Sequence, residues 1–207
     1  DVPDLVDLVN PLIGTEGDAN RRSESAYGGM VPGVTHPFGM TQWTPMTRKN
    51  EIKRCPYYYL DTHIMGFLGS HQPAIWMGDY GQVSMMPGLG LVEVDYDRRK
   101  QPFDHADETA TPCSYAVTMN QGSPQSIHVE LSATSRAALL VFTFPPETAA
   151  DQPPHVVIDA SREFTETTHS DRTPREGWLR IDPANREVVG YNTDRYSAHL
   201  GPPLPNF

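Results

Sequence analysis

Residues 113–144 read CSYAVTMNQGSPQSIHVELSATSRAALLVFTF, and this stretch decides the fold class. Apolar and polar side chains alternate in 113–120 and again in 126–134, the period of two that marks a strand with one buried face. The Asn, Gly, Ser and Pro residues between them favour a turn. Residues 136–144 form an almost continuous apolar run, which predicts a strand buried on both faces. The stretch therefore predicts consecutive antiparallel strands.

The same signals extend outward in both directions from this stretch. Further strands are predicted at 155–160, 177–182 and 187–191, the last two joined by the turn 182–185. The first hundred residues are richer in Gly and Pro, and they contain four candidate strands and one short helical turn. The candidate strands are 39–43, 64–68, 82–86 and 89–95, and the helical turn is 4–9. The chain is therefore predicted to be an all-β, antiparallel two-sheet β-sandwich with long Gly/Pro-rich loops in its N-terminal half.

Composition limits the class of protein further. The chain has 207 residues and a net charge of -10, so it repels phosphate backbones and anionic lipid surfaces, and we expect neither a nucleic acid nor a membrane partner. No apolar run approaches the roughly 20 residues of a membrane-spanning helix. Cys55 and Cys113 can form one disulfide or remain two free thiols, and sequence does not choose between these states.

Residues 69–81, GSHQPAIWMGDYG, place a histidine, an amide, a tryptophan, an acid and three glycines in thirteen positions. A core strand would alternate apolar residues, and an ordinary surface loop rarely carries Ile, Trp and Met together. Glycine lets the backbone approach another molecule closely. We expect this segment to contact a ligand or a second domain.

Several stretches, in order along nearly the whole chain, carry a resemblance to a known family. They are VNPLIGT (9–15), VPGVTHPFGMTQWTP (31–45), GFLGSHQPAIWMGDYGQVSMMPG (66–88), FDHADETATPCSYAVTM (103–119) and VELSATSRAALLVFTFP (129–145). They resemble the N-terminal β-sandwich domain of the exo-acting α-mannosidases of glycoside hydrolase family 92.

The resemblance implies that residues 1–207 are a single domain, the N-terminal part of a larger two-domain enzyme whose (α/α)6 catalytic barrel is not in this chain. The Pro-rich stretch ending in Phe207 fits a continuation of this kind. Such enzymes are calcium-dependent inverting exo-α-mannosidases that act on N-glycans or mannan, here with α-1,2 linkages expected. The resemblance places both catalytic carboxylates and the Ca²⁺ on the barrel. It thus implies no catalytic residue and no metal ligand in this chain, no activity of the chain alone, and a secreted or periplasmic location.

In this interpretation the 69–81 segment closes the active-site pocket from the sandwich side. Trp76 would stack on a sugar face or plug the interface between domains, because aromatic rings suit both places. Gln72 and Asp79 would bind hydroxyl groups, although Asp79 also suits a turn that caps its own backbone. His71 would bind a hydroxyl group or be a structural histidine. The Gln72-Pro73-Ala74 sequence departs from the Leu-Ser-Gly common in the family, which affects the linkage preference most.

Two other classes of function stay open. The chain can be an independent carbohydrate-binding, lectin-like sandwich, since fold alone does not separate the two. It can also be a structural domain whose partner is the barrel. Other motifs are weaker: Asp61 and His63 are two potential metal ligands but not a site, and His36 in 31–45 suits a structural role.

Overall fold

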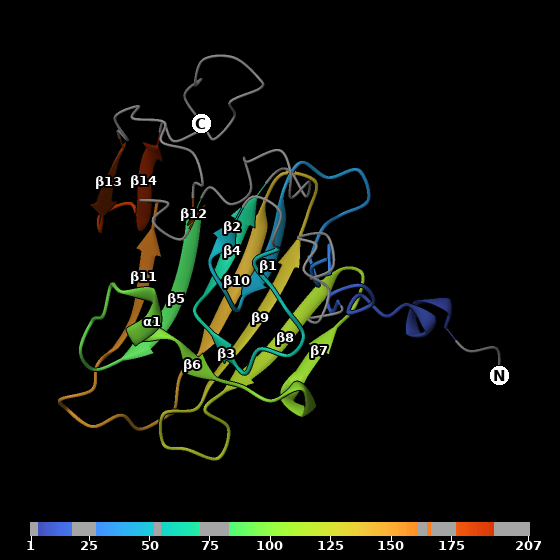
Figure 1. Cartoon of the computed structure of the whole chain (residues 1–207). Helices are drawn as coiled ribbons and strands as arrows, with labels where there is room; N and C mark the ends of the chain where they lie inside the picture. Colours follow the sequence, from blue (N-terminus) through green and yellow to red (C-terminus); the bar gives the residue numbers. More distant parts are fainter. Residues whose placement is uncertain are drawn as a thin grey trace.

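The computed structural model describes residues 4–17, 28–51, 55–70, 83–160, 165–166 and 177–192. Two four-stranded antiparallel sheets stack face to face, as Figure 1 shows. The first has the order β1-β4-β5-β11, comprising β1 (Gln42–Met46), β4 (Gly66–Ser70), β5 (Val83–Leu89) and β11 (Pro154–Asp159). The second has the order β10-β9-β8-β7, comprising β10 (Ala138–Thr143), β9 (Ile127–Ala133), β8 (Ser114–Met119) and β7 (Glu108–Ala110). The predicted β-sandwich is confirmed.

Other elements connect and flank these sheets. The helical ones are η1 (Leu5–Leu8), α1 (Tyr96–Arg99) and η3 (His105–Asp107). The extended pairs are β2 (Asn50–Glu51) with β12 (Thr165–Glu166), β3 (His63–Ile64) with β6 (Gln101–Pro102), and β13 (Gly177–Asp182) with β14 (Glu187–Asn192). η1 confirms the helical turn predicted at 4–9, because the side chain of Asp4 accepts a hydrogen bond from the Val6 N–H and caps it.

The core lies between the two sheets. Alternate residues of β8 and β9 point inward and are almost completely buried: Tyr115, Val117, Met119, Ile127, Val129 and Leu131. Trp43 and Phe67 of the first sheet face them. Burying each large apolar side chain contributes about 1.5–3 kcal/mol, so the period of two read from 113–134 contributes directly to stability.

The helical turn α1 covers part of the outer face of the first sheet. It packs Tyr96 against Met46, Met65 and Leu68 in a second apolar cluster. Asp95 caps α1 by accepting hydrogen bonds from the next turn. The buried Arg99 donates to the Met65 carbonyl oxygen at 3.1 Å, which ties the segment to the sheet.

Two of the predicted strands need correction. The 136–144 run is not buried on both faces, because Leu139 is 62% exposed while Leu140 packs on the core. β10 is an edge strand of the described sheet, and Val141, on the same outer face as Leu139, is also exposed. Residues 89–95 are not a separate strand: β5 continues to Leu89, and Gly90, at a φ of 75°, turns the chain toward α1. The apolar side chains that suggested a strand there, such as Leu91, are exposed.

Cys55 and Cys113 are both free thiols. Cys55 is buried beside the core, whereas Cys113 is exposed just before β8, so the alternative of two thiols holds. Burial raises the pKa of the Cys55 thiol to about 12. Among the described helices none is long and apolar enough to cross a membrane.

Candidate functional site

The predicted ligand segment leaves the first sheet between β4 and β5. His71, Gln72, Trp76 and Asp79 lie outside the described residues, so their roles stay predictions. Residues 71–82, which join β4 to β5, are called the 71–82 segment below. The structure does fix both of its ends, because Gly69 pairs with Val83 across the antiparallel β4 and β5. β1 begins at this same end, where Gln42 pairs with Ser70. We call this end of the sheet, formed by Gln42, Gly69, Ser70 and Val83, the rim.

Trp43 lies directly beneath the rim. Its indole packs on Gly69 so closely that a Cβ added to Gly69 would lie 2.8 Å from Cζ2. Trp43 is 8% exposed and belongs to the core, and it also bridges to Val34 through paired backbone hydrogen bonds. The root of the 71–82 segment is therefore attached to a rigid, well-packed part of the sandwich.

Gln42 places an unsatisfied polar atom at the rim. Its amide packs against Gly33, where an added Cβ would lie 2.3 Å from Nε2. Its Oε1 is buried and has no hydrogen-bond partner among the described residues. A buried acceptor without a partner costs roughly 1–3 kcal/mol, so such an atom marks a place where a donor from a ligand or another segment is favoured. Sequence reasoning did not single out Gln42, although it lies within the quoted stretch 31–45.

A buried acid network lies elsewhere, at the start of β7. The Glu108 carboxylate has 0% side-chain exposure and accepts a bond from the Tyr57 hydroxyl, at 2.8 and 2.9 Å from its two oxygens. The Nδ1 atom of His105 lies 3.2 Å from Oε2 of the same carboxylate. His105 also bonds the Tyr59 carbonyl and stacks on the Tyr59 ring at 4.0 Å between centroids.

Burial sets the electrostatics of this network. Desolvation raises the pKa of Glu108, and the hydrogen bond from Tyr57 and the nearby His105 oppose that rise only in part. Desolvation and the Glu108 charge raise the pKa of Tyr57 and of the buried Tyr115 as well. Because the carboxylate is inaccessible, the network joins the 55–60 segment to β7 and offers no acid to a bound sugar.

The two potential metal ligands noted in the sequence are occupied by protein contacts. Asp61 accepts three hydrogen bonds, from Thr47 Oγ1 at 2.7 Å and from Nε and Nη2 of Arg48 at 2.8 and 2.6 Å. The His63 ring bonds the Thr62 hydroxyl at 2.9 Å. Within the described ranges no three His, Cys, Asp or Glu side chains come together as a metal site would require, so these residues do not fit a calcium ion.

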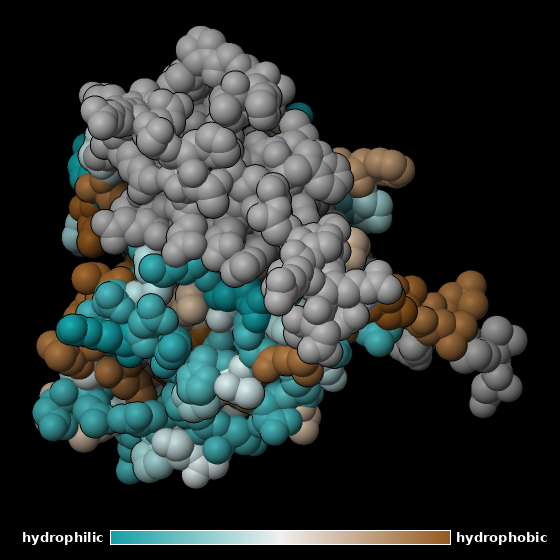
Figure 2. Space-filling model, in the orientation of Figure 1, coloured by the Kyte–Doolittle hydropathy of each residue, from teal (hydrophilic) through white to brown (hydrophobic). Residues whose placement is uncertain are grey.

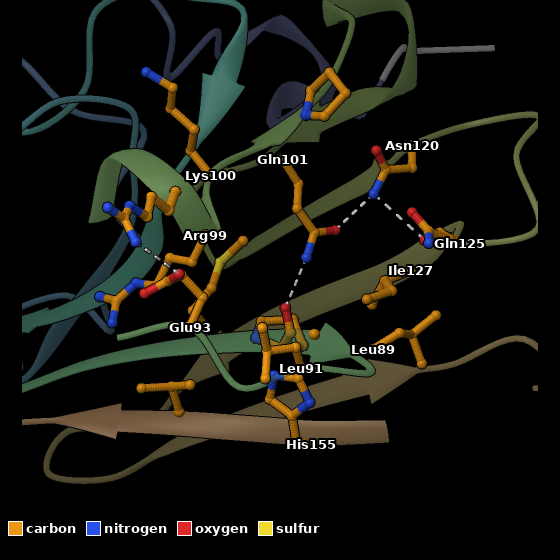
Figure 3. Close-up of a pocket in the computed structure, with 16 residues that line it drawn as sticks. Leu89, Leu91, Glu93, Arg99, Lys100, Gln101, Asn120, Gln125, Ile127 and His155 are labelled. Atoms are coloured by element: carbon orange, nitrogen blue, oxygen red, sulfur yellow. Dashed lines mark hydrogen bonds and ion pairs between the residues drawn. The ribbon is translucent and has the colours of Figure 1, made fainter. Parts of the chain in front are cut away.

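A pocket of about 240 Å³ opens at the other end of β5, beside Leu89 (Figure 3). Gln101 and Asn120 form one wall: Asn120 Nδ2 donates to Gln101 Oε1 at 2.8 Å, and Gln101 Nε2 donates to the Pro87 carbonyl at 3.0 Å. The Nδ1 atom of His155 is buried without a partner among the described residues. Among the described residues that line the pocket Glu93 is the one acid, so these residues do not form the pair of carboxylates that glycoside hydrolysis needs.

Comparison with known proteins identifies the family of this chain. The sequence model of the glycosyl hydrolase family 92 N-terminal domain matches residues 8–203. The chain belongs to glycosyl hydrolase family 92. The matched range contains the rim, the 71–82 segment and both sheets, so the resemblance seen in the quoted stretches is confirmed.

Solved family 92 structures share the fold. The family 92 inverting mannosidase BT2199 from Bacteroides thetaiotaomicron is 35% identical, with a TM-score of 0.72 over 95% of this chain and 23% of its own. The α-mannosidase BT3965 from the same organism is 26% identical, with a TM-score of 0.63 over 77% of this chain and 21% of its own. A structure of BT3965 with mannoimidazole, at 23% identity, has a TM-score of 0.70. No curated protein matches the chain.

The chain thus spans about a quarter of the length of these solved relatives. As a family 92 N-terminal domain, it is part of a glycosyl hydrolase family, and its sandwich corresponds to one portion of a larger mannosidase fold. Sequence reasoning identified the family and the segment that leaves the rim. It missed Glu108 and the pocket, because their partners come from distant parts of the chain, such as Tyr57, which is 51 residues away from Glu108.

Proposed function

We propose that this chain is the N-terminal domain of a calcium-dependent inverting exo-α-mannosidase that removes α-1,2-linked mannose from N-glycans or mannan outside the cytoplasm. An (α/α)6 barrel would follow in the same polypeptide and would hold the Ca²⁺ and both catalytic carboxylates. The observation that carries the proposal is the family 92 match over residues 8–203, together with 35% identity to an inverting mannosidase.

The chemistry of inversion supports placing the catalytic groups outside this chain. One carboxylic acid protonates the leaving oxygen and one carboxylate activates water, at a separation of roughly 6.5–9.5 Å. The buried Glu108 and the Arg48-bound Asp61 are engaged in structural contacts. We therefore expect the chain alone to be inactive, and its part in the reaction is to bind and enclose the terminal sugar.

The rim supports a role for the 71–82 segment in that enclosure. Both ends of the segment are held by paired strands above Trp43, so the segment has a rigid base. Trp76 would lie against the apolar face of the mannose ring, while Gln72, Asp79 and His71 would bind its hydroxyl groups. Excluding water around one terminal sugar is what an exo-acting enzyme requires of such a segment.

Kinetics of the full-length enzyme test this role. Trp76→Ala should lower kcat/KM for an α-1,2-mannobiose substrate on the order of tenfold, as expected when an aromatic contact and its apolar burial are lost. Trp178→Ala is the matched control, because Trp178 is half exposed on the β13–β14 hairpin and should leave kcat/KM unchanged. Equal kcat/KM for the Trp76 variant and the parent enzyme would reduce Trp76 to a packing residue.

The pocket beside Leu89 favours one second candidate, an independent carbohydrate-binding domain. Its amide and imidazole groups lie next to apolar walls, the combination that binds sugars. Calorimetric titration of the isolated chain with mannose and mannobiose separates the two functions. A half-pocket should bind very weakly, whereas saturable binding by this chain alone would favour the lectin-like function.

A further inference from the structure

Phe38 breaks two local rules at once. It is 106% exposed, although phenylalanine is among the residues most often buried. Its φ is 60°, in the left-handed region that a bulky side chain rarely adopts. Exposing an aromatic ring and holding its backbone in a costly conformation both oppose folding of this chain, and such outliers concentrate at functional contacts.

The turn that carries Phe38 is held from several sides. The Gly39 N–H donates to the His36 carbonyl at 2.7 Å and closes a tight turn over Pro37 and Phe38. Past the turn, the Met40 N–H donates to the Ser135 carbonyl of the second sheet's β9–β10 connection at 2.7 Å. The backbone that carries the ring is therefore held in place, so little backbone freedom is lost when the ring binds.

The turn that carries Phe38 is connected to the rim. Thr35 Oγ1 donates to the Thr41 carbonyl at 3.2 Å, and the next residue, Gln42, pairs with Ser70, where the 71–82 segment leaves the sheet. Phe38 and the rim thus belong to one connected unit. Met40, 62% exposed, extends the apolar surface of the turn.

We propose that Phe38 is an anchor that inserts into an apolar pocket on the remaining polypeptide of the full-length enzyme and thereby sets the position of the rim. The inference rests on the proposed function. We assign the pocket to the remaining polypeptide because 77% of the length of BT2199 lies outside the part that matches this chain, and a region of that size can form such a pocket. Burying a presented aromatic ring in a well-packed pocket is the typical form of an interface anchor.

Phe38→Gly should have opposite effects in the isolated chain and in the full-length enzyme, and this difference tests the anchor. Phe38→Gly removes the exposed ring and relieves the left-handed backbone, so the isolated 207-residue chain should unfold at an equal or higher urea concentration. In the full-length enzyme the same substitution should lower kcat/KM about tenfold and speed proteolysis between the sandwich and the following polypeptide by a similar factor. Phe38→Leu, which keeps an apolar side chain, should recover part of both losses.

Ile181→Ala is the matched control, because Ile181 is 73% exposed on β13 and belongs neither to the Phe38 turn and the rim nor to the lining of the pocket. It should change neither readout. The anchor is overturned if Phe38→Gly and Ile181→Ala behave alike in the full-length enzyme, or if the isolated chain forms a Phe38-dependent dimer in sedimentation, which would make a second copy the partner. If the full-length enzyme releases no mannose, the proposed function fails, and the proteolysis rate still decides whether Phe38 anchors the sandwich.

Discussion

Gly69 and Trp43 are in direct contact at the root of the 71–82 segment, and the contact leaves no room for a methyl group on Gly69. Val34 and Gly69 lie on either side of Trp43 in the backbone pairing, so the ring is fixed where β1, β4 and the segment meet. The strand end from which the segment leaves the sheet therefore depends on a core contact, which core mutagenesis can test.

Gly69→Ala should lower the free energy of unfolding by about 1–3 kcal/mol, because the indole or the strand must shift to admit the added carbon. Urea denaturation of the isolated chain measures this loss. Gly29→Ala is the control, since nothing lies within 4 Å of a Cβ added there. Equal stability of the two variants would contradict the contact.

Asp61→Asn should cost about 1–3 kcal/mol, because it removes a charged acceptor that satisfies both Thr47 and Arg48 in a partly buried position. Asp97→Asn removes an exposed ion pair with Lys100, at 3.3 Å, and should cost at most about 0.5 kcal/mol. Chemical denaturation at low and moderate salt compares the two. A similar small loss for both would show that the Arg48–Asp61 pair is not structural.

The stability of the chain should depend on pH through Glu108. Its pKa is raised in the folded state by burial, so the folded state favours the protonated acid. The contribution of that acid is fully present below the ordinary pKa near 4.5 and is lost as pH rises through the folded-state pKa. The Glu108→Gln variant cannot ionise, so its stability relative to the parent chain should rise with pH above about 4.5. A constant difference, or one that falls with pH, would contradict the assignment.

The two thiols should react at very different rates. Cys113 is exposed, whereas Cys55 is buried and its pKa is raised to about 12. Ellman's reagent at pH 8 should therefore modify one thiol quickly in the native chain and the second only in denaturant. Cys113→Ser should abolish the fast phase, and two fast phases in the native chain would show that Cys55 is accessible.

Short-range sequence patterns predicted the strands whose formation depends on nearby residues. The strands β8 and β9 and the β13–β14 hairpin follow from a period of two and from turn residues, and the structure places them within one or two residues of the expected bounds. β1 begins at Gln42 and not at Gly39, because the Phe38 turn takes up Gly39. Apolar content alone misled at two places: the outer face of β10, and 89–95, where Gly90 ends the strand.

The candidate site was predicted less completely than the fold. The quoted stretches identified the family, and they located the 71–82 segment, whose four proposed sugar contacts are still predictions. The Tyr57–Glu108 pair and the contact of Gly69 with Trp43 depend on residues 51 and 26 positions apart, and periodicity carries no information on such pairs. The left-handed φ of Phe38 was also invisible, because a Pro-Phe-Gly sequence suggests the glycine as the flexible residue.

The N-terminal segment also carries exposed apolar residues. Leu5 and Leu8 of η1, and Ile13 shortly after it, are each more than two-thirds exposed. Figure 2 shows hydrophobic residues on the N-terminal segment that projects at the right of the view. Exposed apolar residues that form a contiguous patch are typical of interaction sites. Together with Phe38 they give the described part of the chain exposed apolar surface of the kind that the proposed contact requires.

We propose above all that this chain completes the sugar pocket of a mannosidase whose catalytic groups lie elsewhere in the polypeptide. Proton NMR of α-1,2-mannobiose hydrolysis, run with Ca²⁺ on the full-length enzyme and on the 207-residue chain, tests it most directly. We expect the full-length enzyme to release β-mannose first, as inversion requires, and the chain alone to release none. Mannose release by the isolated chain, or none by the full-length enzyme, would contradict the claim.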